Sequence, residues 1–88
     1  MYVLIHHNIK DSSAFWESAK RMEKGESTPP SGLTPLFFYP IKNDKNAFCL
    51  YKANSLDALQ DFVDSELEEA SENAYFPVDE EVAEGLLA

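Results

Sequence analysis

The stretch YVLIHHNIKDSSAFWESAKRM (residues 2–22) begins as a strand and continues as a helix. Neighbouring strand residues point to opposite faces of a sheet, so residues 2–9 form two rows of side chains. The two adjacent histidines therefore cannot reach one pocket together. We expect the more apolar row to face the core; it consists of Val3, Ile5, His7 and Ile9. The other row should lie on the opposite face; it consists of Tyr2, Leu4, His6 and Asn8.

The residues after this strand predict a helix. Residues 11–13 (DSS) offer side-chain oxygens that cap a helix N-terminus. Phe15, Ala19 and Met22 then recur at helical spacing, and Gly25 favours a stop.

The rest of the chain repeats this alternation. LTPLFFYPI (33–41) and NAFCLYKA (46–53) predict a strand hairpin, a helix follows from Asn54 or Ser55, and NAYFPVD (73–79) predicts a last strand. The order strand, helix, strand, strand, helix, strand predicts one domain over residues 1–88. Its fold class is α+β, with the ferredoxin-like split βαβ topology (βαββαβ), a four-stranded antiparallel sheet and both helices on one face.

Proline positions support this topology. A proline has no N–H to give to a sheet, so it is tolerated mainly on edge strands. Pro35, Pro40 and Pro77 fall on the second and fourth predicted strands, which are the edges in this topology.

The second predicted helix contains a conflict near its end. Leu56, Leu59 and Val63 share one apolar stripe. Glu66 would project into that stripe if the helix continued unbroken. We therefore predict that the helix ends or bends near Ser65 and by about Leu67.

Composition and charge narrow the function classes. The last basic residue is Lys52, and 11 of the 16 Asp and Glu residues follow it, so the net charge of −9 arises in the second half of the chain. Such a surface repels phosphate, and we expect neither nucleic acid nor a membrane as a partner. The first residues lack the basic start and cleavage site of a signal peptide, and the single cysteine excludes an internal disulfide. These observations favour the cytoplasm.

The segment AFCLYKANSLDALQDFV (47–63), followed by NAYFPVD (73–79), resembles small ferredoxin-like proteins of the dimeric α+β-barrel group. More narrowly, it is similar to uncharacterised bacterial domains of that shape, one branch of which is described as nickel-binding. The resemblance implies a homodimer formed through the open sheet face, with a cavity between the paired sheets. We therefore expect a homodimer that binds a small ligand or serves a structural or regulatory role.

Two further functions remain open. Some members of the group are monooxygenases that degrade haem or oxidise aromatic polyketides, and Asn8 resembles the first-strand asparagine of the haem-degrading branch. This chain differs in that its single tryptophan, Trp16, lies on the first predicted helix and no histidine follows His7. The other function is binding of nickel or zinc, which imidazole and carboxylate ligands suit. No cofactor is specified, and enzyme activity stays uncertain.

The candidate site residues follow from these functions. His6 is the candidate metal ligand, although no His-x-His, HExxH or CxxC motif is present. Cys49 is predicted to be an inert, buried thiol with no histidine near it in sequence. The candidate ligand-binding residues are His6, Asn8, Tyr39, Tyr51 and Trp16.

Overall fold

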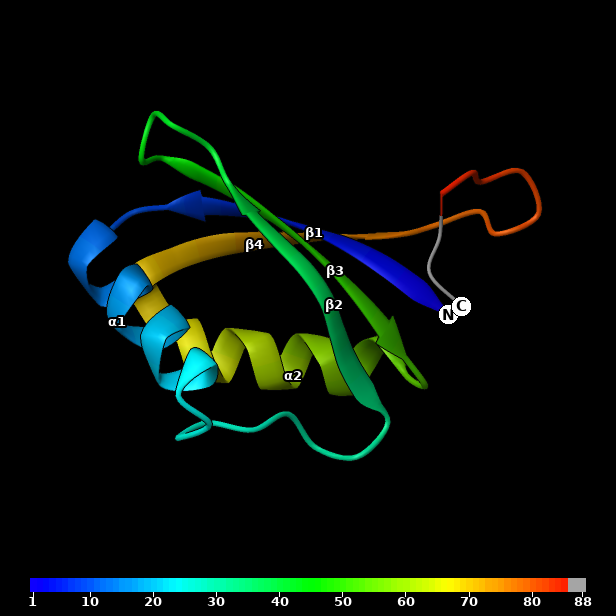
Figure 1. Ribbon diagram of the computed structural model, residues 1–88, viewed down its shortest axis with the longest axis horizontal. Coiled ribbons are helices and arrows are strands. Elements are labelled where there is room, and N and C mark those ends of the chain that lie inside the picture. The colour runs from blue at the N-terminus through cyan, green and yellow to red at the C-terminus, as the bar shows by residue number, and fades with distance from the viewer. Residues whose placement is uncertain (86–88) are drawn as a thin grey trace.

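A computed structural model describes residues 1–85. The elements are β1 (Tyr2–Ile9), α1 (Ser12–Glu23), β2 (Leu33–Pro40), β3 (Asn46–Ala53), α2 (Leu56–Leu67), a 3₁₀ turn η1 (Glu68–Ala70) and β4 (Ser71–Pro77). The strands form one antiparallel sheet in the order β2-β3-β1-β4. Both helices cover the same face of this sheet (Figure 1). The predicted α+β ferredoxin-like topology is confirmed.

Both helices begin as the sequence predicts. The Asp11 side chain accepts a hydrogen bond from the Ala14 N–H at 3.1 Å, and the Ser55 hydroxyl accepts one from the Ala58 N–H at 3.2 Å. Each bond satisfies a backbone donor that has no partner within its helix. After α1, Gly25 adopts a φ of 76°, a conformation that glycine takes without steric cost.

The end of α2 also agrees with its prediction. Regular helix stops at Leu67, and Glu68 then takes a φ of 48° before the 3₁₀ turn leads into β4. Regular helix therefore ends at the residue by which the sequence predicts a stop, with Glu66 still in its last turn.

The edge strands carry all three strand prolines, as expected from the missing N–H. In β2 the register with β3 shifts between Pro35 and Phe37, so this edge is irregular. Most of β2 is exposed or half-buried, and Leu33 is its one buried residue.

The core lies between the sheet and the helices, and it consists of two clusters. The larger cluster contains Val3, Ile5, Leu33, Tyr51, Ala53, Leu59 and Val63. The smaller cluster contains Ile9, Phe15, Ala47 and Ala70. His7 lies between Ile5 and Ile9 on this face and is only 2% exposed, which confirms the predicted core row.

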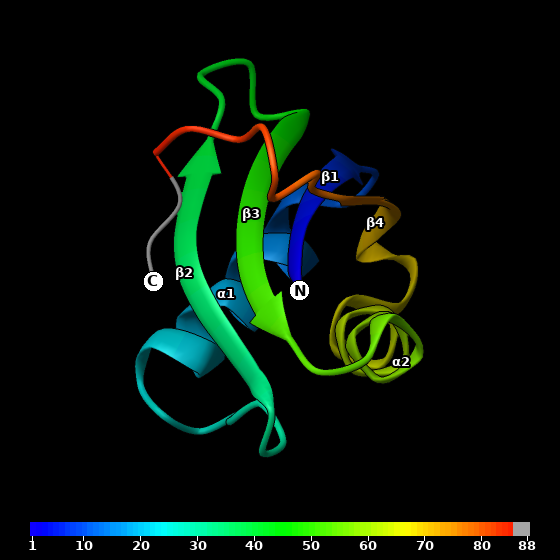
Figure 2. The same cartoon turned by 90° about the vertical axis from the view of Figure 1, so that its right-hand side faces the viewer.

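The opposite sheet face, which we call the open face, carries Tyr2, Leu4, His6 and Asn8 of β1, and no helix covers it (Figure 2). Tyr39 of β2 and Phe76 of β4 stay 60% and 52% exposed there. The chain after β4 turns back across the open-face side (Figures 1 and 2). None of the helices in residues 1–85 is long and apolar enough to cross a membrane.

Candidate functional site

A cavity of about 690 Å³ lies between the sheet and the helices, beneath the poorly covered strand β2. We call it the helix-side cavity. Its walls come from α1, α2, β2 and β3 and are mainly apolar; they include Phe15, Trp16, Met22, Leu36, Phe38 and Phe62. Three polar side chains of the sheet, His7, Cys49 and Tyr51, also line it. A few polar groups in an apolar enclosure are typical of small-molecule sites.

His7 and Cys49 contact one another in this lining. Their strands pair with His7 opposite Ala47, so Cys49 lies two residues further along on the same face. The imidazole Nε2 is 3.0 Å from the Cys49 Sγ, and Nδ1 is 2.7 Å from the Asn73 Oδ1 on β4. The three side chains form a continuous line across three adjacent strands.

The direction of the hydrogen bonds follows from Asp64 on α2. Its carboxylate accepts from the Asn73 Nδ2 at 3.0 Å, which turns the amide oxygen of Asn73 towards His7. That oxygen only accepts, so His7 carries its proton on Nδ1. Nε2 is therefore an acceptor, and the Cys49 S–H donates to it.

Two hydroxyl groups hold this network in place. Tyr75 donates to the Asp64 carboxylate at 2.6 Å, and Ser71 donates to the Asn73 amide oxygen at 2.7 Å. Because its partners are fixed from both sides, Asn73 orients the His7 ring as the third member of a Cys–His–Asn arrangement does in cysteine-dependent enzymes.

The electrostatic environment keeps the pair neutral. Burial lowers the pKa of His7, against a smaller opposing effect of the Asn73 hydrogen bond. Burial also raises the pKa of the Cys49 thiol to about 12, as predicted for a cysteine in a central strand. At neutral pH the site thus holds a thiol and a neutral imidazole.

Tyr51 presents a polar group without a protein partner. Its side chain is 4% exposed, and its hydroxyl makes no hydrogen bond with any residue of 1–85. Every fully buried side-chain nitrogen and oxygen in that range has a partner, so this hydroxyl reaches accessible space. Burial, and then the charges of Cys49 and Glu66, raise the Tyr51 pKa, so the hydroxyl stays protonated.

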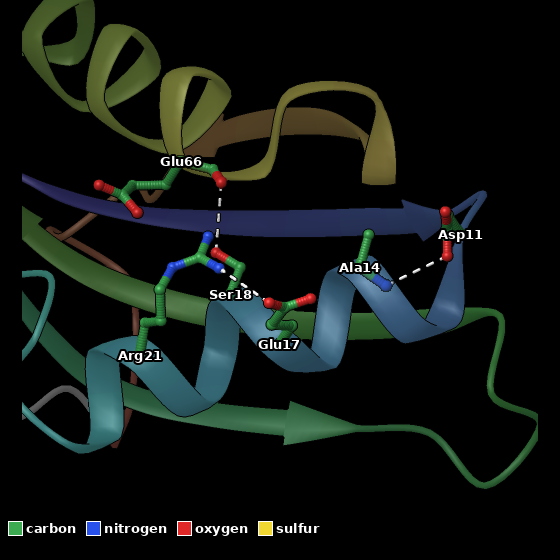
Figure 3. A network of polar contacts seen from close by, with 6 residues as sticks. All are labelled: Asp11, Ala14, Glu17, Ser18, Arg21 and Glu66. Carbon is green, nitrogen blue, oxygen red and sulfur yellow. Dashed lines mark hydrogen bonds and ion pairs between the residues drawn. The ribbon is translucent and has the colours of Figure 1, made fainter.

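The α1 side of the cavity is anchored at both ends. At one end, Asp44 of the β2–β3 loop accepts hydrogen bonds from the Ser12 hydroxyl at 2.6 Å and the Trp16 Nε1 at 3.0 Å. These two bonds lower the pKa of Asp44, with Ser12 the larger cause. At the other end, the buried Ser18 hydroxyl donates to the Glu66 carbonyl at 3.2 Å (Figure 3). Trp16 and Ser18 are therefore fixed on the cavity wall.

The predicted ligand-binding residues fall on both faces of the sheet. His6 and Asn8 lie on β1 and Tyr39 on β2, all on the open face, whereas Trp16 and Tyr51 line the helix-side cavity. The structure therefore does not bring the five together.

His6 itself is held by open-face neighbours. Its Nε2 is 2.8 Å from the Asn46 Oδ1, and its ring lies 5.0 Å from the Phe48 ring. Residues 1–85 contain no group of three or more side chains placed to hold a metal ion.

Sequence reasoning missed the His7–Cys49–Asn73 line. The strand pattern places His7 in the core, and Cys49 has no histidine near it in sequence. The missing information was the strand register, because Cys49 lies 42 positions and Asn73 lies 66 positions after His7 along the chain. The register of β1 against β3, which pairs His7 with Ala47, is what places Cys49 beside His7.

Comparison with known proteins adds no relative: no protein-family model matches this chain, and neither a curated protein nor a solved structure is significantly similar to it.

Proposed function

We propose that this protein binds a small, mainly apolar molecule in the helix-side cavity. The observation that carries the proposal is this partly open cavity of about 690 Å³, whose mainly apolar lining includes aromatic side chains and three polar groups of the sheet. The charged residues Lys20, Glu23 and Glu66 also line it from the helices. Cavities of roughly 300–1,000 Å³ hold ligands of small-molecule size.

The polar groups indicate what the ligand carries. The Tyr51 hydroxyl has no hydrogen-bond partner among residues 1–85, so it favours a ligand with an acceptor oxygen, such as a carbonyl. Phe15 and Trp16 of α1 and Phe38 of β2 pack with ring centroids 5.8–6.1 Å apart in the same lining. They favour an aromatic or aliphatic body. An aromatic ketone combines both features.

Trp16 provides the test, because it is the only tryptophan and lines the cavity. Titration with benzylacetone, an aromatic ketone, is expected to change Trp16 fluorescence saturably, with a Kd of about 1 mM or lower. The variant Ala19→Phe places a ring into the cavity lining and should weaken binding at least about tenfold.

The matched control is Ala58→Phe, which adds the same ring on the exposed surface of α2. It should bind benzylacetone as the wild type does. The absence of saturable binding to the wild type, or equal loss in both variants, would overturn the proposal.

We also propose that the open face forms a homodimer interface. Tyr39 and Phe76 support this, because they are large side chains that stay more than half exposed on the two edge strands. Tyr39 stacks on Phe37 with ring centroids 4.4 Å apart, which extends the aromatic surface. Exposed apolar surface of this kind commonly marks an interaction site.

A further inference from the structure

We infer that Cys49 is a nucleophile that captures α,β-unsaturated carbonyl compounds bound in the helix-side cavity, with His7 as its base. This inference rests on the proposed function, because the compound must first enter the cavity. It adds a reaction and a chemical class of substrate to the site.

The geometry supplies the three parts that nucleophilic addition requires. The Cys49 Sγ lines the cavity and is 3.0 Å from a ring nitrogen that accepts its proton. The Asn73 amide, 2.7 Å from the other ring nitrogen, holds His7 in the tautomer that can accept. Tyr51 lines the same cavity, and its hydroxyl, which has no partner within the described residues 1–85, can donate a hydrogen bond to the carbonyl oxygen.

The reaction is an addition in which nothing leaves and nothing is oxidised. The thiol proton passes to the His7 Nε2 as the sulfur forms a bond to the β-carbon of the ligand. The electron pair of the carbon–carbon double bond moves towards the carbonyl, whose oxygen becomes an enolate. His7 then returns the proton to the α-carbon. The product is a thioether, with neutral His7 regenerated.

The environment of Cys49 makes this reaction depend on binding. A thiol whose pKa is about 12 provides little free thiolate at neutral pH, so reagents from bulk water react slowly. A ligand in the cavity gains from a high effective concentration beside the sulfur. The site therefore discriminates in favour of apolar electrophiles that fit the cavity.

The test uses benzylideneacetone, the unsaturated counterpart of benzylacetone, and intact-mass measurement. Cys49 is the only cysteine, so a single adduct reports on it. The adduct rate should saturate with probe concentration, and benzylacetone should compete. Cys49→Ser should form no thioether adduct. His7→Gln should react at least about 100-fold more slowly, the usual effect of losing a general base.

A second measurement needs no variant and covers the case in which His7→Gln does not fold. The rate at which benzylideneacetone modifies Cys49 is divided by the rate at which iodoacetamide modifies it. The same ratio is measured for the free thiol of N-acetylcysteine. The protein's ratio should exceed that of the free thiol at least about tenfold.

The outcomes separate the two proposals. If benzylacetone binds but benzylideneacetone gives no saturable adduct, or if the two rate ratios are equal, the nucleophile inference is wrong and ligand binding stands. If folded His7→Gln reacts as fast as the wild type, the role of His7 as base is wrong. If benzylacetone does not bind, the proposed function itself fails.

Discussion

His7 lies between the two apolar clusters of the core, which is an unusual position for a polar side chain. A buried polar group costs free energy unless it is hydrogen-bonded, and both His7 ring nitrogens have partners. The strand alternation was sufficient to predict that His7 is buried. Its partners could not be predicted, because Cys49 and Asn73 reach it only through the pairing of strands distant in sequence.

The lowered pKa of His7 predicts a pH dependence of stability. The folded protein binds a proton on His7 less readily than the unfolded chain, whose histidine has the ordinary pKa of 6.5. The stabilisation from neutral His7 is therefore complete above about pH 6.5 and is lost as the pH falls towards the lowered pKa. Between pH 7 and 5 the free energy of unfolding of the wild type should fall more steeply than that of His7→Gln.

Urea unfolding at a series of pH values measures this difference, which is at most about 1.4 kcal/mol per pH unit for one group. The carboxylates titrate in both proteins, so their contributions to the free energy of unfolding cancel in the comparison. Parallel curves for the two proteins would contradict the lowered pKa.

At the scale of helices and strands, local sequence signals are sufficient to predict most of the fold. The caps at Asp11 and Ser55 and the prolines on the edge strands each act within a few residues of their position. The helix-side cavity was not predicted, because it depends on how far α1 lies from β2. The shift in register between Pro35 and Phe37 is likewise a tertiary feature. The sequence predicts Tyr51 and Trp16 as ligand-binding residues, and the tertiary packing places both in the lining of one cavity.

The end of α2 gives a prediction for this scale. Glu68 has a φ of 48° and a ψ of −123°, a combination that is strained for any residue with a Cβ. Glu68→Gly should therefore raise the free energy of unfolding by about 1 kcal/mol. The measurement is the urea midpoint at an unchanged m-value.

Glu69→Gly is the matched control, since it removes the same charge from a residue with ordinary φ. It should lower stability by about 0.5–1 kcal/mol through the entropy of glycine. Stabilisation by both variants would indicate a charge effect instead of backbone strain.

At the scale of the whole molecule, the two sheet faces have different proposed roles. The helix face encloses the cavity, and the open face offers the exposed side chains for self-association. Sedimentation equilibrium at micromolar concentration should give a mass of about twice the 9.9 kDa of one chain. Phe76→Glu should shift the protein towards the monomer, because it places a charge within the interface.

Ala58→Glu is the control for this prediction. Ala58 is exposed on α2, on the helix side of the sheet, so the same charge there should leave the dimer intact. A wild type that stays monomeric at every concentration would contradict the open-face interface and leave the cavity unaffected.

The central claim is that the ligand site lies on the helix side of the sheet. The most direct measurement is the two-dimensional amide NMR spectrum of labelled protein during titration with benzylacetone. The Trp16 indole signal and the amides of Met22, Cys49 and Phe62, which line the cavity, should shift saturably with one common Kd. Shifts concentrated instead at open-face residues such as His6, Tyr39 and Ala74, or no saturable shift at all, would contradict the account.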